Sequence, residues 1–168
     1  MPAQILVVED ENIVAMNLQN RLQSLGYIVA GVASTGEEAL ARAGEVTPDL
    51  VLMDIRLKGD MDGVAAAETL RARHGVPVVY LTAYADSEPL TRARMTEPAG
   101  YLLKPFEARE LQTAIELALH RHAAEKRLRQ SEERYALAAA AGNDGIWDWN
   151  LTTDEVHFSL RWKLILGY

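Results

Sequence analysis

The stretch from Asp49 to Asp54, which reads DLVLMD, constrains the fold of this chain more than any other. Its four consecutive apolar residues form a short uninterrupted run, which predicts a β-strand buried on both faces of a parallel sheet. The run ends abruptly in the carboxylate of Asp54. Because ligands of open α/β sheets bind outside the carboxyl ends of the strands, we expect Asp54 to face a crevice and not the core.

Four more apolar runs alternate with segments of helical periodicity. The expected strands cover residues 4–8, 27–33, 49–53, 76–81 and 100–103. The expected helices follow each strand, and they include residues 36–44, 63–74 and 87–95 and a last helix that starts near Glu107. This alternation predicts an α/β fold with a five-stranded parallel sheet wound on both faces.

Polar side chains stand at four of the five predicted strand ends. They are the pair Glu9-Asp10, then Asp54, Thr82 and Lys104. One polar residue at a strand end is usually a turn residue or a helix cap. A complementary set of acids, a hydroxyl and an amine at one edge of a sheet indicates a functional site instead.

These residue types suit phosphoryl transfer. Carboxylates of Asp10 and Asp54, with Glu9, can converge on one divalent cation, and oxygen ligands of this kind are typical of Mg²⁺. Without a metal the neighbouring acids would repel one another. Thr82 and Lys104 can donate hydrogen bonds to phosphoryl oxygens on the other side. The predicted reaction is transfer of a phosphoryl group to Asp54, which gives an acyl phosphate that water can hydrolyse.

Composition excludes several other classes of function. The 168 residues contain no cysteine, so disulfides and thiolate metal sites are excluded. A net charge of −7 disfavours non-specific nucleic-acid binding. The N-terminal apolar run is too short for a signal peptide, and no stretch approaches the ~18 apolar residues of a membrane span. We therefore expect a cytoplasmic protein without nucleic-acid or membrane contact.

Residues 1–122 resemble a response-regulator receiver domain of the chemotaxis-regulator type. The resemblance rests on Glu9-Asp10, on Leu52-Met53-Asp54, on Leu81-Thr82-Ala83, and on the GYLLKPF stretch at residues 100–106. It implies a flavodoxin-like sheet with strand order 2-1-3-4-5, which is carried over from that fold. The loop between Asp54 and Gly63 departs from the common pattern, because it is one residue longer and lacks proline.

The resemblance also implies a role for each residue of the site. Asp54 would be the phosphoacceptor, and Mg²⁺ would be ligated by Asp10, Asp54 and the main-chain carbonyl of Arg56, with Glu9 acting through a metal-bound water. The phosphodonor would be a histidine kinase or a phosphotransfer protein.

On the phosphoryl side, Thr82 and Lys104 would bind the phosphoryl oxygens. Thr82 and Tyr101 would together form the conformational switch, and the Lys104–Pro105 bond would be cis.

The rest of the chain has a different character. Residues 123–134 are mostly charged and predict a helical connector. Leu128 lies within it and Tyr135 directly follows it, seven residues later. A single exposed helix and a pairing helix both fit this pattern, so a homodimer through the last receiver helix and the connector is possible. Residues 135–168 resemble the truncated start of an α+β PAS sensor domain, on the GIWDWNL stretch at residues 145–151. Trp147 and Trp149 are expected on the core-facing side of its first strand.

Two alternatives to a phosphorylated switch stay open. The first is a receiver fold used only for dimerisation or docking. The second is a Mg²⁺-dependent aspartyl phosphatase of the haloacid-dehalogenase kind, which would need a second acid two residues after the nucleophile, where Arg56 stands. We expect no stand-alone enzyme in this chain, and the full-length protein to be a hybrid histidine kinase, a diguanylate cyclase or another signalling protein.

Overall fold

The computed structural model of the chain describes residues 1–83, 91–93, 96, 98–141 and 147–167. It divides into two compact units, Met1–Ala123 and Ala124–Tyr168, and each is considered by itself.

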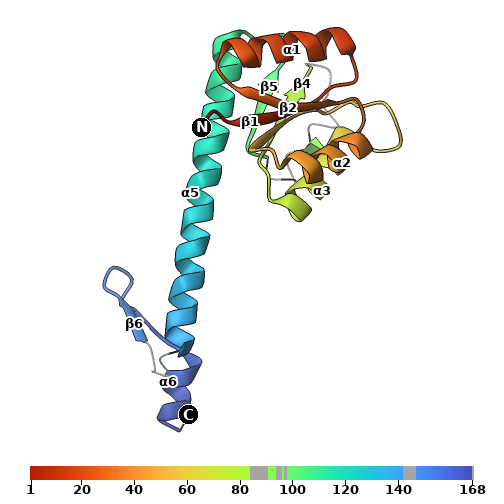
Figure 1. Ribbon diagram of the computed structural model, residues 1–168. Helices are drawn as coiled ribbons and strands as arrows, with labels where there is room; N and C mark the ends of the chain where they lie inside the picture. The colour runs from red at the N-terminus through yellow and green to blue at the C-terminus, as the bar shows by residue number, and fades with distance from the viewer. Residues whose placement is uncertain (84–90, 94–95, 97, 142–146, 168) are drawn as a thin grey trace. The chain divides into compact units, whose positions relative to one another are not determined.

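The first unit is built on a five-stranded sheet. Its strands are β1 (Gln4–Val8), β2 (Ile28–Ala33), β3 (Leu50–Asp54), β4 (Val78–Thr82) and β5 (Gly100–Leu103). All neighbouring strands pair in parallel, in the order β2-β1-β3-β4-β5. The predicted flavodoxin-like fold is therefore confirmed (Figure 1).

Helices cover both faces of this sheet. They are α1 (Asn12–Ser24), α2 (Gly36–Val46), α3 (Gly63–His74) and α5 (Ala108–Ala141). The start of α5 and all of α1 lie over one face, and α2 and α3 lie over the other (Figure 1). The helix expected at residues 87–95 lies outside the described residues, apart from residues 91–93, which are helical.

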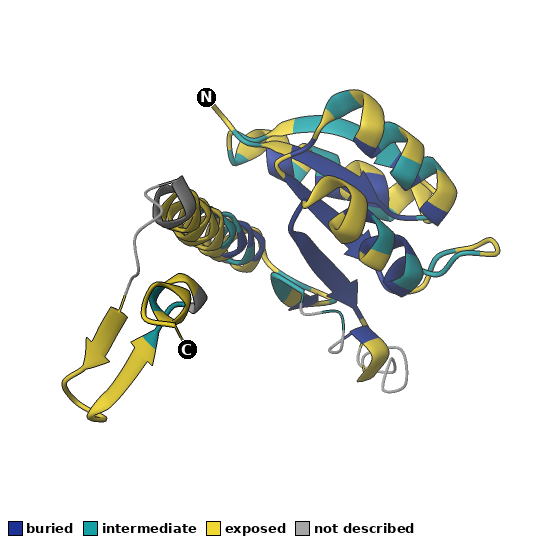
Figure 2. Cartoon of the chain, turned by 90° about the horizontal axis from the view of Figure 1, so that it is seen from below, coloured by how far each residue is buried: buried dark blue, intermediate teal, exposed yellow. Residues whose placement is uncertain are grey.

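The two faces carry separate apolar cores. In β1, Ile5 and Val7 pack toward α1 and α5, whereas Leu6 and Val8 pack toward α2 and α3. This division follows from the strand period of two, which sends successive side chains to opposite faces. Every residue of β3 is buried (Figure 2), as the uninterrupted apolar run predicts for residues 50–53.

Local chemistry explains where the elements begin. The Thr35 hydroxyl accepts a hydrogen bond from the Glu38 amide at the start of α2, and Asp62 caps α3 in the same way through the Ala65 amide. Strand β4 begins at Val78, two residues later than expected, because Pro77 has no N–H to donate to the sheet.

The second unit contains the end of α5, a hairpin and a short helix. Strands β6 (Trp147–Asn150) and β7 (Glu155–Phe158) pair antiparallel, and the Ser159 hydroxyl caps α6 (Leu160–Ile165). Trp147 and Trp149 share one face of this hairpin. Both are exposed, which differs from the core-facing position that the sequence predicts. None of the helices in the described part of the chain is long and apolar enough to cross a membrane.

Candidate functional site

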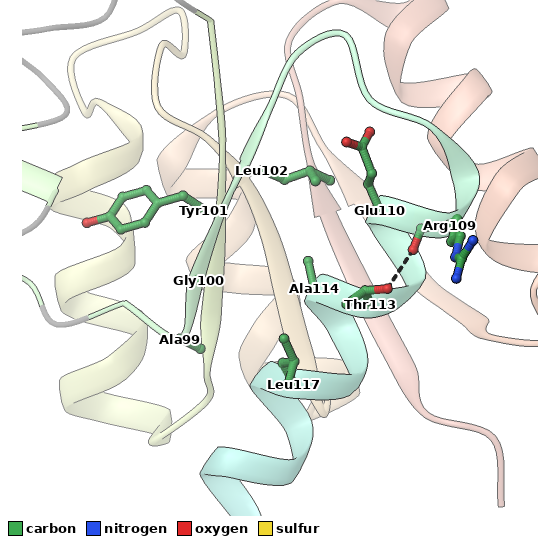
Figure 3. Close-up of a pocket in the computed structure, with 9 residues that line it drawn as sticks. All are labelled: Ala99, Gly100, Tyr101, Leu102, Arg109, Glu110, Thr113, Ala114 and Leu117. Carbon is green, nitrogen blue, oxygen red and sulfur yellow. Dashed lines mark hydrogen bonds between the residues drawn. The ribbon is translucent and has the colours of Figure 1, made fainter.

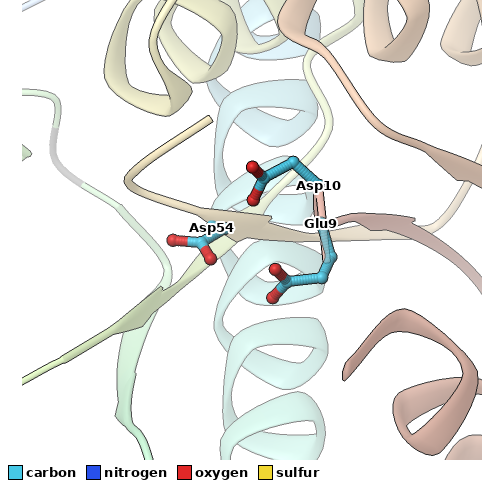
Figure 4. Close-up of side chains that lie close together, drawn as sticks. All are labelled: Glu9, Asp10 and Asp54. Carbon is cyan, nitrogen blue, oxygen red and sulfur yellow. The ribbon is translucent and has the colours of Figure 1, made fainter. Parts of the chain in front are cut away.

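Three carboxylates meet at the ends of β1 and β3. Oxygens of Glu9, Asp10 and Asp54, which we call the acidic cluster, all lie within 4.8 Å of one another (Figure 4). They meet because β1 and β3 are neighbours in register, with Val8 opposite Met53. The next residue of each strand therefore reaches the same edge of the sheet. Glu9 and Asp54 are buried, and Asp10 is partly exposed.

Lys104 contacts two of these acids. Its Nζ lies 2.6 Å from Asp54 Oδ2 and 2.6 Å from Glu9 Oε2. The backbone amide of Lys104 donates to the Thr82 carbonyl at 2.7 Å, which extends the pairing of β5 with β4, and the Lys104–Pro105 bond is cis. A cation from the far edge of the sheet thus reaches carboxylates at its centre.

Burial and charge shift the pKa values of these groups. Burial is the main factor that raises the pKa of Glu9, and the neighbouring charge of Asp54 adds to it, against the lowering effect of the Lys104 hydrogen bond. Burial alone would lower the pKa of Lys104. Its hydrogen bonds to Asp54 and Glu9 outweigh this effect and raise the pKa, so the ammonium stays charged.

The Asp54 backbone is packed closely by the start of α3. A side chain added at Gly63 would place its Cβ 1.9 Å from the Asp54 carbonyl oxygen, so only glycine fits this approach. The Gly63 amide donates to the Ile55 carbonyl at 3.1 Å, and the Arg56 amide donates to Asp54 Oδ1 at 2.9 Å. The assignment of the Arg56 carbonyl as a metal ligand stays a prediction.

Thr82 and Tyr101 take different positions. Thr82 is buried at the end of β4, directly after Leu81, which pairs with Asp54. Its hydroxyl donates to the Ala83 carbonyl at 3.2 Å. Tyr101 lies two residues before the end of β5, is exposed, and stacks on the buried Tyr80 ring with centroids 5.8 Å apart. Thr82 therefore lies at the same sheet edge as the acidic cluster. Tyr101 pairs with Tyr80 and lies two residues back from that edge.

Two basic side chains near the site were not singled out from the sequence. Lys58 Nζ lies 2.9 Å from Asp10 Oδ2. Arg21 of α1 donates to the Phe106 carbonyl at 2.6 Å, and its guanidinium carbon lies 5.9 Å from the centre of the Phe106 ring. The loop that contains Lys58 is one residue longer than the common pattern, but nothing in the sequence indicates the contact of Lys58 with Asp10. Nothing indicates the Arg21 contact either, since its partner is 85 residues away.

The acidic cluster has the donor chemistry of a site for a hard divalent cation. All three side chains offer carboxylate oxygens, which Mg²⁺ prefers to nitrogen or sulfur ligands. Asp10 and Asp54, with Glu9, would hold the ion. When bound, it would supply positive charge that offsets the charge of an incoming phosphoryl group.

Comparison with known families decides the identity of the first unit. Residues 5–116 match the model of the response regulator receiver domain. The chain belongs to this family. The receiver domain is 38% identical over 121 residues to the transcriptional regulatory protein PdtaR of Mycobacterium tuberculosis, a match covering 72% of this chain and 58% of PdtaR. It is also 38% identical over 120 residues to the phyllosphere-induced regulator PhyR of Methylorubrum extorquens, covering 71% of this chain and 44% of PhyR. The matches thus span about half the length of these relatives.

Solved structures of receiver domains have the same fold. The signal receiver domain of a modulated diguanylate cyclase from Desulfovibrio desulfuricans is 41% identical with a TM-score of 0.72, covering 74% of this chain and 99% of that one. The N-terminal domain of a response regulator/sensory box/GGDEF 3-domain protein from Carboxydothermus hydrogenoformans is 37% identical with a TM-score of 0.67, covering 73% and 98%. Both likenesses cover nearly the whole of the other domain.

Proposed function

We propose that this chain is the receiver part of a two-component signalling protein, and that Asp54 accepts a phosphoryl group from a histidine kinase or a phosphotransfer protein. One observation supports this most strongly. The Lys104 ammonium lies within hydrogen-bond distance of both Asp54 and Glu9, beside the third carboxylate of Asp10. A nucleophilic carboxylate, a fixed cation and a candidate Mg²⁺ site are thus assembled at one edge of the sheet.

The proposed reaction uses Asp54 as the nucleophile. A carboxylate oxygen of Asp54 attacks the phosphorus, and the bond from phosphorus to the imidazole nitrogen of the donor breaks. Lys104 and Thr82 would donate hydrogen bonds to the oxygens of the transferred group. Attack by water on the resulting acyl phosphate would release inorganic phosphate and restore the carboxylate.

A small phosphodonor tests this proposal without knowledge of the kinase. We expect acetyl phosphate with Mg²⁺ to add one phosphoryl group to the chain, detected by intact mass, and we expect Asp54→Asn to abolish it. Asp60→Asn is the matched control, because Asp60 is an exposed acid of the neighbouring loop. Absence of labelling of the folded wild-type chain by acetyl phosphate and by every cognate kinase tried would contradict the proposal.

A docking role without phosphorylation has one observation in its favour. A cavity of about 430 Å³ lies between β5 and α5, lined by residues that include Tyr101, Leu102, Ala114 and Leu117 (Figure 3). Such a surface could bind a partner whether or not Asp54 is modified. Partner binding that is unchanged in Asp54→Asn and by phosphorylation would favour this alternative.

Helix α5 continues from the first unit through the connector, residues 123–134, and this supports transmission of the signal through that helix. Leu117, Leu128 and Tyr135 are large apolar residues exposed on this helix. We propose that they form a homodimer contact, which sedimentation of the chain and of Leu128→Lys would test, the variant being expected to stay monomeric.

The segment after the connector is proposed to begin a PAS sensor domain. The antiparallel hairpin of β6 and β7 supports this, as does the Carboxydothermus protein, in which a sensory box is named after a response regulator. A cytoplasmic location and an output through a further domain, as in a diguanylate cyclase or a hybrid kinase, belong to the same proposal.

A further inference from the structure

Two lysines contact the three acids of the acidic cluster. Lys104 contacts Glu9 and Asp54, and Lys58 contacts Asp10, with its Nζ 2.9 Å from Asp10 Oδ2. Each carboxylate therefore has an ammonium partner in the chain itself. Mutual repulsion of the acids is reduced by these partners without any added cation.

The two lysines are held very differently. The Lys104 side chain is 25% exposed and makes two short contacts, whereas the Lys58 side chain is 79% exposed and makes one ion pair. An exposed ion pair of a long side chain is weak, because water screens it and the side chain loses freedom in making it. Lys58 is therefore the lysine that can leave its partner.

The loop around Lys58 is anchored on both sides. Leu57 and Met61 are partly buried and pack against the core between the sheet, α2 and α3. Gly59 turns the chain directly after Lys58 in a left-handed conformation, with φ of +114°. Lys58 can thus swing away from Asp10 by rotation of its own side chain while the loop backbone stays in place.

We propose that Lys58 is an internal counter-ion of Asp10, which a divalent cation must displace in order to bind the acidic cluster. The inference rests on the proposed function only in taking Asp10 as a ligand of that cation. An Asp10 oxygen that accepts a hydrogen bond from the Lys58 ammonium is less available to a metal ion, and the positive charge of the ammonium repels that ion. Lys58 therefore weakens metal binding and raises the concentration of divalent cation that is needed to fill the site.

Removal of the Lys58 charge should strengthen metal binding. We expect Lys58→Gln to bind Mn²⁺, and Mg²⁺ by competition, roughly two- to fivefold more tightly, which matches the strength of an exposed ion pair. Free Mn²⁺ is measured by electron paramagnetic resonance during titration of the full chain. Lys58→Arg keeps the charge and should bind like the wild type.

Lys126→Gln is the matched control. Lys126 is an exposed lysine of α5 in the second unit, and its replacement changes the net charge by the same amount. Equal affinities of Lys58→Gln and Lys126→Gln, or weaker binding by Lys58→Gln, would overturn the inference. Thermal unfolding checks that each variant is folded, and Lys58→Met replaces the glutamine variant if that one is not.

The same titrations separate this inference from the proposed function. If Lys58→Gln binds Mn²⁺ more tightly but acetyl phosphate leaves wild-type Asp54 unlabelled, the inference stands and the proposed function fails. If Asp54 is labelled but the two glutamine variants bind alike, only the inference fails. If Asp10→Asn binds Mn²⁺ as the wild type does, Asp10 is not a ligand and the inference is wrong.

Discussion

At the scale of single residues, Gly63 determines how closely α3 approaches the strand that carries Asp54. A Cβ at this position would lie 1.9 Å from the Asp54 carbonyl oxygen. This oxygen belongs to the backbone and cannot rotate away as a side-chain atom could. We expect Gly63→Ala to lower the free energy of unfolding by roughly 1–3 kcal/mol, as overpacking does. We also expect slower labelling of Asp54 by acetyl phosphate, because the end of β3 must shift. Urea unfolding and intact mass measure the two effects.

Gly44→Ala is the control for this substitution. Gly44 lies within α2, and the nearest atom that a Cβ would meet is His74 Cε1, at 3.8 Å. Alanine forms helix more readily than glycine, so we expect a gain of up to about 1 kcal/mol and unchanged labelling. If the two alanine variants behaved alike, the close approach at Gly63 would have no energetic consequence.

Arg21 is a second residue expected to affect the site indirectly, through its contact with Phe106, two residues after Lys104. Its hydrogen bond to the Phe106 carbonyl and its position over the Phe106 ring hold the loop that follows Lys104. We expect Arg21→Met to cost roughly 1–2 kcal/mol of stability and to slow the labelling of Asp54, since Lys104 is then held less firmly. Arg21→Lys retains one donor and should recover part of the rate. A wild-type rate in folded Arg21→Met would show that Lys104 does not depend on this contact.

At the scale of elements, the start of α3 is stabilised by one carboxylate with two partners. Asp62 accepts from the Ala65 amide and pairs with Arg92 Nη1 at 2.7 Å. Burial opposes the charge of Asp62, but these two partners outweigh burial and lower its pKa. Because the folded-state pKa lies below 3.8, the stabilisation is present above that value and is lost as the pH falls through the lowered pKa.

Asp62→Asn isolates this titration. Asparagine keeps an oxygen that can cap α3 but removes the negative charge. We expect the variant to be less stable than the wild type by under ~1 kcal/mol near neutral pH, since the Arg92 pair is exposed. The difference should shrink at pH values below 3.8. Denaturant unfolding of both proteins across this pH range provides the measurement, and a difference that grows in acid would contradict the assignment.

The elements also show what the sequence could predict. The expected ranges of β1, α3 and β5 agree with Gln4–Val8, Gly63–His74 and Gly100–Leu103. The two strands are short apolar runs with clear ends, and α3 is rich in alanine, begins after the capping Asp62 and ends before Gly75. Strand β3 continues one residue further than expected, through Asp54, because Asp54 still pairs with Leu81 of β4. Such a pairing depends on the neighbouring strand and leaves no mark in the local sequence.

In the site too, some features could be predicted from the sequence and others could not. Residues at strand ends could be identified because the topology of a parallel sheet brings those ends together, as it does for the acidic cluster and Lys104. The contacts of Lys58 and Arg21 could not be predicted. They depend on the path of a loop and on the packing of a helix against a distant turn, and neither follows from residue type or spacing.

At the scale of the whole molecule, the two units differ in their capacity to fold alone. The receiver unit, Met1–Ala123, contains both apolar cores, whereas the described side chains of the second unit are exposed or only partly buried. We expect residues 1–123 alone to unfold in one cooperative transition and to be labelled by acetyl phosphate at the wild-type rate. Residues 124–168 alone should lack a cooperative transition, since so few residues bury too little apolar surface. Calorimetry of both fragments tests this.

The central place of β3 has a consequence for how the molecule opens. This strand has paired neighbours on both sides, and all of its residues are buried. Its amide protons should accordingly be among the last to exchange with deuterium, whereas those of α5 after Ala123, where no described residue is buried, should exchange early. The carboxylate proposed to carry the signal thus lies on one of the strands that open most slowly, so local opening elsewhere in the domain leaves its position unchanged.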